Sequence, residues 1–119
     1  MEGDRLTKIF ELQKMLDGDI CGKRNVEKTR EEWVKAELLA LFSELNEVLS
    51  EVNFKWWKNP KEVNWDNVKD EIIDVLHFLV SLSLKTGMDE SEFFARYEKK
   101  NEVNFARQRD IEGYKPEKL

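Results

Sequence analysis

The sequence is poor in cysteine, histidine, proline and glycine. Among 119 residues there are one Cys, one His, two Pro and five Gly. A single cysteine, Cys21, excludes an internal disulfide and argues against a zinc cluster, which needs several cysteine or histidine ligands. Few helix-breaking residues, in a chain that is 40% hydrophobic and 38% charged, are typical of a soluble, helix-rich protein.

An excess of basic residues and a long apolar run are also lacking. The 20 Lys and Arg are outnumbered by 25 Asp and Glu, so that the net charge is -5, and we expect no nucleic acid and no membrane surface as partner. An anionic small molecule stays compatible, because a bound divalent cation can reverse the local field. The most apolar window, residues 72–84, is too short to span a bilayer. The first residues, MEGDRLTKIFELQ, lack the apolar core of a signal peptide, so we expect a cytoplasmic protein.

Hydrophobic periodicity predicts four helices in a single domain, residues 1–119. The first spans about 4–17 and ends at DGDICGK, where two glycines occur within five residues. The second starts near Thr29, where TREE forms a capping box, and ends near residue 52. After the connector NFKWWKNPKEVNWDN, the third spans about 66–86 and is closed by Gly87. The fourth starts at DESE and ends near 108, which leaves 109–119 as a C-terminal tail.

The pattern contains no strand and no glycine-rich phosphate loop. The fold class that it predicts is all-α, with an antiparallel four-helix bundle as its core.

Two acidic pairs lie within helices that are otherwise apolar. Glu44 and Glu47 occur in SELNEV, and Glu71 and Asp74 occur in VKDEIIDVLHF. On a helical wheel the first pair shares one edge of the apolar arc with Glu37 and Glu51. If the second and third helices pack side by side, both pairs converge, and like charges in a low-dielectric setting repel unless a cation compensates them. Because magnesium prefers carboxylate and water oxygens, the pairs predict a magnesium site.

A solvated helix face is the alternative interpretation, and for glutamates three or four residues apart it is the common one. It fits Glu44 and Glu47 taken alone, but it fits Glu71 and Asp74 poorly because their helix has almost no polar face. His77 lies one turn from Asp74. We interpret it as a core-edge histidine bonded to a neighbouring carboxylate or carbonyl, and not as a catalytic residue.

The two acidic pairs and their surroundings resemble a known family. Glu44-x-x-Glu47 followed by Glu71-x-x-Asp74 resembles the metal-binding pattern of the all-α nucleoside triphosphate pyrophosphatases, the MazG-like superfamily. NFKWWKNP, NWDNVKDEIIDVLHF and YEKKNEVNFARQ followed by EGY are similar to motifs of its dimeric, all-α dUTP diphosphatases. LQKML also fits, since that branch has a glutamine in its first helix. The resemblance implies hydrolysis of dUTP to dUMP and diphosphate with two or three Mg²⁺ ions per site.

The resemblance also implies roles for individual residues. The metal ligands are Glu44, Glu47, Glu71 and Asp74, and Glu47, in preference to Glu44, is the catalytic carboxylate that orients the attacking water. The implied substrate contacts are Gln13 at the uracil edge, Phe54 and Trp57 as stacking or wall residues, Lys55 and Lys58 near phosphates, and Lys100, Asn101, Asn104, Arg107 and Tyr114 in the C-terminal motif.

Two alternatives in function stay open. One is a house-cleaning pyrophosphatase that acts on dCTP or modified nucleotides, and the other is a non-catalytic helical interaction module. Only TGMDESEFF separates the third helix from the C-terminal motif, so the chain is compact and resembles the minimal core of the superfamily. Four tryptophans and an apolar third helix present more hydrophobic surface than a bundle of four helices can cover. This excess predicts a homodimer or a dimer of dimers.

Overall fold

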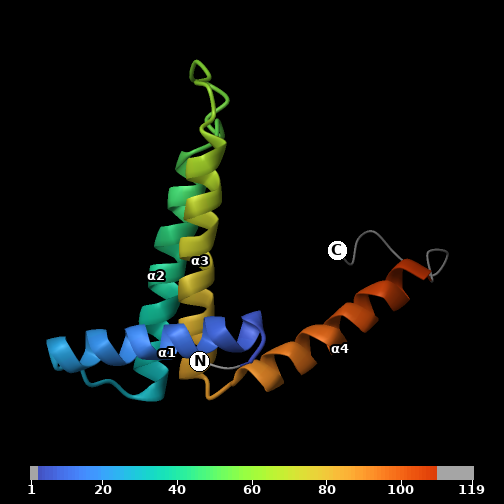
Figure 1. Ribbon diagram of the computed structural model, residues 1–119. Helices are drawn as coiled ribbons and strands as arrows, with labels where there is room; N and C mark the ends of the chain where they lie inside the picture. The colour runs from blue at the N-terminus through green and yellow to red at the C-terminus, as the bar shows by residue number, and fades with distance from the viewer. Residues whose placement is uncertain (1–2, 110–119) are drawn as a thin grey trace. The chain divides into compact units, whose positions relative to one another are not determined.

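The computed structural model describes residues 3–109, and these form four helices and no strand (Figure 1). The helices are α1 (Arg5–Arg24), α2 (Arg30–Ser50), α3 (Trp65–Lys85) and α4 (Glu90–Arg109). The all-α prediction is therefore confirmed. Helices α1, α2 and α3 belong to one compact unit, and α4 belongs to a second, which we describe by itself. Arg109, the first residue of the predicted tail, ends α4, and the rest of that tail, residues 110–119, lies outside the described residues.

Local sequence signals set most helix ends. Thr29 and Glu32 form the predicted capping box, in which the Thr29 hydroxyl accepts from the Glu32 amide at 3.2 Å and the Glu32 carboxylate accepts from the Thr29 amide at 3.0 Å. Asp89 caps α4 by accepting from the Glu92 amide at 2.8 Å. Gly87 follows α3 with φ of +88°, the left-handed conformation that favours glycine. Three of the four predicted helices therefore have nearly the predicted bounds.

Helix α1 is longer than predicted, so the break expected at DGDICGK is wrong. The helix continues through Gly18 and Gly22 to Arg24, and the C-cap residue Asn25 follows in the left-handed conformation, with φ 52° and ψ 47°. A glycine inside a helix costs about 1 kcal/mol relative to alanine, and tertiary contacts override that cost. The side chain of Asp17 accepts a hydrogen bond from Ser81 of α3 at 2.7 Å, which holds this part of α1 in place.

Helices α2 and α3 lie side by side in opposite directions, and α1 lies across them (Figure 1). Their shared core is small: among the described apolar residues only Phe10, Val68 and Val80 are buried. Large apolar side chains therefore stay on the surface of this unit, for example Leu39 and Phe42, which are 70% and 65% exposed.

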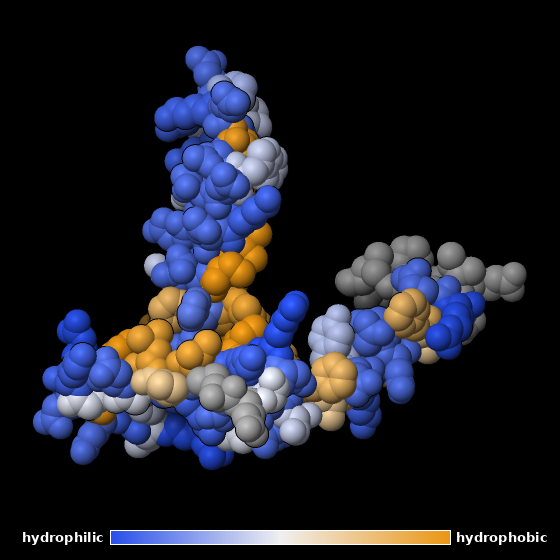
Figure 2. All heavy atoms as spheres, viewed as in Figure 1, coloured by the Kyte–Doolittle hydropathy of each residue, from blue (hydrophilic) through white to orange (hydrophobic). Residues whose placement is uncertain are grey.

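Apolar residues gather on the face where α1 crosses the α2–α3 pair (Figure 2). Exposed apolar side chains occur on all three helices, including Leu12, Met15, Leu45, Leu49, Ile72 and Ile73. The three helices thus carry an apolar surface that the single chain leaves uncovered. No described helix is long and apolar enough to cross a membrane.

Candidate active site

Three carboxylates converge where α2 and α3 lie side by side. Each of Glu44, Glu71 and Asp74 has one carboxylate oxygen that lies within 4.8 Å of the corresponding oxygens of the other two. Glu44 comes from α2, and the other two come from successive turns of α3. The expectation that the two acidic motifs meet in one space is confirmed for these three side chains.

Glu47 stands at the edge of this acidic cluster. Its side chain is exposed and lies outside the group of three, but its charge acts on the cluster. Partial burial raises the pKa of Glu71, and the negative charges of Asp74, Glu47, Glu44 and Glu51 raise that pKa further. The cluster is thus a centre of like-charge repulsion that a cation would relieve.

The donor set of the cluster fits a hard divalent cation. Carboxylate oxygens are the ligands that Mg²⁺ prefers, and Mg²⁺ usually keeps several waters or takes phosphate oxygens besides one or two protein carboxylates. Asp74 is exposed, so one side of the cluster is open to solvent or to a phosphate. Residues Glu44, Glu71 and Asp74 could therefore hold magnesium while leaving positions for substrate.

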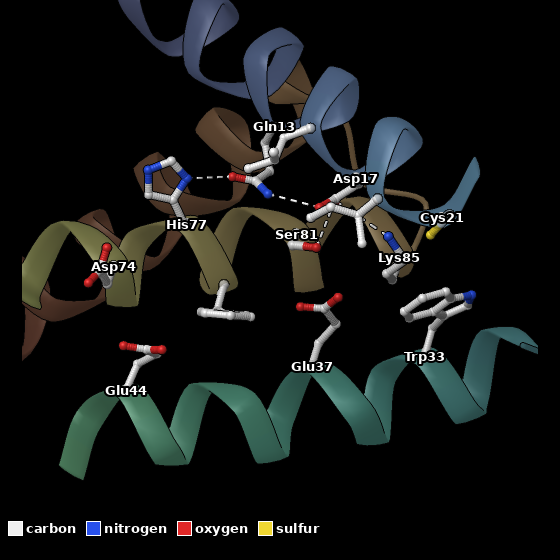
Figure 3. Close-up of a pocket in the computed structure, with 13 residues that line it drawn as sticks. Gln13, Asp17, Cys21, Trp33, Glu37, Glu44, Asp74, His77, Ser81 and Lys85 are labelled. Carbon is white, nitrogen blue, oxygen red and sulfur yellow. Dashed lines mark hydrogen bonds and ion pairs between the residues drawn. The ribbon is translucent and has the colours of Figure 1, made fainter. Parts of the chain in front are cut away.

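A pocket of about 490 Å³ extends from the acidic cluster between α1, α2 and α3 (Figure 3). Glu44 and Asp74 lie at one end of it, and Trp33 and Lys85 lie at the other. Its volume is in the range of small-ligand pockets. It is lined by Gln13, Leu16, Asp17, Ile20 and Cys21 of α1, by Trp33, Glu37 and Glu44 of α2, and by Asp74, His77, Phe78, Ser81 and Lys85 of α3.

A chain of hydrogen bonds links α1 to α3 along this pocket (Figure 3). Asp17 accepts from Ser81 Oγ at 2.7 Å, from Lys85 Nζ at 3.4 Å and from Gln13 Nε2 at 2.9 Å. The Gln13 Oε1 atom lies 2.8 Å from His77 Nδ1. Because a carboxylate only accepts, the Gln13 amide must direct its NH₂ group to Asp17 and its oxygen to His77. His77 therefore donates from Nδ1 to Gln13 Oε1.

Gln13, predicted to contact the uracil edge, lines the pocket and is buried. Its two intramolecular bonds hold the carboxamide in one orientation, while one N–H and one oxygen lone pair remain for a ligand. The interpretation of His77 as a residue bonded to a side-chain carbonyl agrees with its contact to Gln13.

Sequence reasoning assigned no role to four polar residues of the pocket, namely Asp17, Glu37, Ser81 and Lys85. A signal for most of them is present in the pattern. His77, Ser81 and Lys85 are spaced by four residues along the otherwise apolar third helix, as Gln13 and Asp17 are along the first. This spacing places polar groups on one helix face, but only the crossing of α1 over α3 shows that the two faces meet.

Glu37 is the most buried acidic residue of the pocket, with 8% of its surface exposed. Its Oε2 atom has no hydrogen-bond partner. Burial raises the pKa of Glu37; the Ser81 hydroxyl and the Lys85 ammonium lower it in part, and the charge of Asp17 raises it. Figure 3 shows its carboxylate pointing from α2 across the pocket toward Ser81.

The predicted contacts of the connector do not line this pocket. Phe54, Lys55 and Lys58 border a separate hollow of about 320 Å³. Beside it the Asn53 side chain donates to the Lys61 carbonyl at 2.8 Å and accepts from the Lys61 amide at 2.9 Å. Trp57 is 60% exposed and contacts the Trp56 ring edge-on at 5.7 Å. The connector thus carries exposed cations and aromatic rings at a hollow that is separate from the pocket between α1, α2 and α3.

The predicted C-terminal motif forms a basic hollow of about 450 Å³ on α4. It is lined by Arg96, Lys99, Lys100, Val103, Asn104 and Arg107. The helix therefore brings Lys100, Asn104 and Arg107 onto one face, whereas Asn101 is not part of that lining. Tyr114 lies outside the described residues.

Replacing Glu71 by Gln should stabilise the metal-free protein and weaken its response to magnesium, because the variant removes a repelling charge and a ligand. For the wild type, Mg²⁺ at about 100 times its Kd should add about 2.7 kcal/mol to the free energy of unfolding. Thermal unfolding with chelator and with excess Mg²⁺ measures both effects. The exposed Glu62→Gln variant is the control, and an undiminished magnesium shift in Glu71→Gln would count against the site.

Replacing Glu37 by Gln should change how stability depends on pH. The raised pKa of Glu37 means that its favourable contribution is present below its ordinary value of 4.5 and is lost as pH rises through the raised pKa. The free energy of unfolding of Glu37→Gln should therefore exceed that of the wild type increasingly from acid to neutral pH. Urea titrations across this range test it, with the exposed Glu31→Gln as control. A difference that is independent of pH would contradict it.

Comparison with known proteins identifies the family of the chain. A family model described as dUTPase matches residues 5–93, a range that includes both acidic pairs and every residue of the pocket. The match ends before the C-terminal motif at 97–108. Searches of curated proteins and of solved structures gave no match. Because the matched range covers most of the sequence, the chain belongs to the dUTPase family.

Proposed function

We propose that this protein is a magnesium-dependent nucleoside triphosphate pyrophosphohydrolase that converts dUTP and water to dUMP and diphosphate. Membership of the dUTPase family supports hydrolysis of a nucleotide, and dUTP and Mg²⁺ are the specific substrate and metal that we propose. The observation that carries the proposal is the convergence of Glu44, Glu71 and Asp74 at one end of a pocket of ligand size.

The acidic cluster supports the metal part of the proposal. Glu44, Glu71 and Asp74, with Glu47 beside them, would hold the two or three magnesium ions expected. Bound magnesium neutralises phosphate charge and makes water a better nucleophile at neutral pH. The ligands lie on two packed helices, so they are held in place without a mobile loop.

Glu47 remains our candidate for the carboxylate that orients the attacking water and accepts its proton. It is exposed and lies outside the group of three carboxylate oxygens, so besides contributing to the metal site it is accessible to water. Glu44 is the second candidate, but its oxygen lies within the group. A carboxylate acting as base must be within hydrogen-bond reach of that water, which its place beside the cluster permits.

The pocket suits a nucleoside attached to those phosphates. Trp33 and Phe78 contribute apolar wall, and Gln13 offers a fixed donor and acceptor to the edge of a base. Lys100, Asn104 and Arg107 on α4 and Lys55 and Lys58 in the connector carry groups that suit phosphate oxygens. Their contacts with substrate, like those of Phe54, Trp57, Asn101 and Tyr114, stay predictions.

Activity measurements test this proposal. Diphosphate release should be detected with dUTP, should require Mg²⁺ and should be much slower with dTTP, UTP, dCTP and dATP. Glu44→Gln and Asp74→Asn should each lower kcat/KM for dUTP by roughly 100-fold or more, since they remove ligands that stabilise developing charge. Glu31→Gln, an exposed change on the same helix as Glu44, is the matched control.

Each other outcome of this panel favours a different function. Release from many triphosphates at similar rates would indicate a house-cleaning pyrophosphatase. Full activity in both ligand variants would overturn the site, and no release from any triphosphate would favour a non-catalytic interaction module.

We also propose that the chain acts as a homodimer or a dimer of dimers. The apolar side chains of α1, α2 and α3 that remain exposed support this, because a unit with three buried apolar residues has little core of its own. Light scattering of the protein eluted from size exclusion at micromolar concentration should give twice the 14.2 kDa chain mass or more. A species at 14.2 kDa alone would contradict it.

A further inference from the structure

The Glu37 carboxylate is the one buried side chain with an unpaired oxygen among the described residues. Glu37 lines the pocket and is 8% exposed, so water satisfies its Oε2 atom poorly. A buried acceptor without a donor is destabilising, and in a binding pocket such a group commonly awaits a donor on the ligand.

The neighbouring donors of the chain leave the Glu37 Oε2 atom unpaired. The hydroxyl of Ser81 has a single proton, which it donates to Asp17 at 2.7 Å. The ammonium of Lys85 lies 3.4 Å from the same carboxylate and 4.7 Å from the centre of the Trp33 ring. Two of its three N–H groups are therefore directed to Asp17 and Trp33, and one remains for a ligand beside Glu37.

The position of Glu37 relative to the acidic cluster matches the shape of a nucleotide. Glu37 and Glu44 are seven residues apart on α2, which places them about 10 Å apart along the axis and about 20° apart around it. On α3, Ser81 and Asp74 have the same spacing, and Figure 3 shows Glu37 opposite Ser81 and Glu44 opposite Asp74. With phosphates at Glu44 and Asp74, a nucleoside in the pocket would direct the far edge of its base to Glu37.

We propose that Glu37 determines base specificity by accepting a hydrogen bond from the N3–H group of uracil through its Oε2 atom. Lys85 donates to a carbonyl that flanks this N–H group. An acceptor next to a donor complements the imide edge of uracil, whereas the unprotonated N3 of cytosine would present a lone pair to the carboxylate oxygen. This inference rests on the proposed function, because it takes the bound substrate to be dUTP.

The experiment compares dUTP with N3-methyl-dUTP, which lacks the proton that Glu37 is proposed to accept. The wild type should prefer dUTP in kcat/KM by roughly 100-fold or more, because the methylated base leaves a buried acceptor unpaired. Glu37→Leu should lower kcat/KM for dUTP by roughly 10- to 100-fold and leave that for N3-methyl-dUTP nearly unchanged. Glu37→Gln keeps an acceptor and should retain most of the preference.

Calorimetric binding of dUMP and N3-methyl-dUMP supplies a readout besides turnover. The wild type should bind dUMP more tightly than it binds N3-methyl-dUMP, by roughly tenfold or more. This comparison uses only the wild type, so it does not depend on whether Glu37→Leu folds. The control variant is Glu31→Leu, which is exposed, lies on the same helix and lines no pocket described above.

The outcomes separate this inference from the proposed function. Hydrolysis of dUTP with equal acceptance of the methylated base by the wild type would overturn the role of Glu37 and leave the function standing. A wild-type preference for dCTP that Glu37→Leu abolishes would assign Glu37 to an exocyclic amino group and overturn the uracil contact. No hydrolysis of any triphosphate would overturn both.

Discussion

Repulsion among carboxylates on two adjacent helices is the constraint on which the site depends. Glu44, Glu71 and Asp74 are brought together by the packing of α2 on α3, and partial burial together with the nearby negative charges raises the pKa of Glu71. A polypeptide that places like charges so close loses stability unless a cation binds. The apolar contacts that hold the two helices together thus also create the acidic cluster at which we propose that magnesium binds.

The pocket depends on the same helix pair and on α1, which crosses it. Asp17 is the centre of this arrangement, because its carboxylate accepts from Gln13 on its own helix and from Ser81 and Lys85 on α3. These bonds join α1 to α3 and fix the Gln13 carboxamide. Glu37 lies on the opposite wall with an unpaired oxygen. The pocket therefore has rigid polar groups at defined places, which is what recognition of a base requires.

The small core and the exposed apolar surface have one cause, which is the small size of the three-helix unit. Three helices of about twenty residues cannot enclose many side chains, so only Phe10, Val68 and Val80 among the described apolar residues are buried. Large apolar residues such as Phe42 stay exposed on the single chain. A second copy that covered this surface would stabilise the helices that carry the site.

The sequence by itself determined the helices and the chemistry of the acidic pairs, since periodicity, capping residues such as Thr29 and the identity of the carboxylates are local properties. It misplaced the end of α1, because glycine propensity at Gly18 and Gly22 was outweighed by contacts between Asp17 and α3. Only the tertiary structure decided that Glu37 is buried without a partner. That fact depends on how α1, α2 and α3 cross, and crossing geometry is set by side-chain packing between segments far apart in the chain.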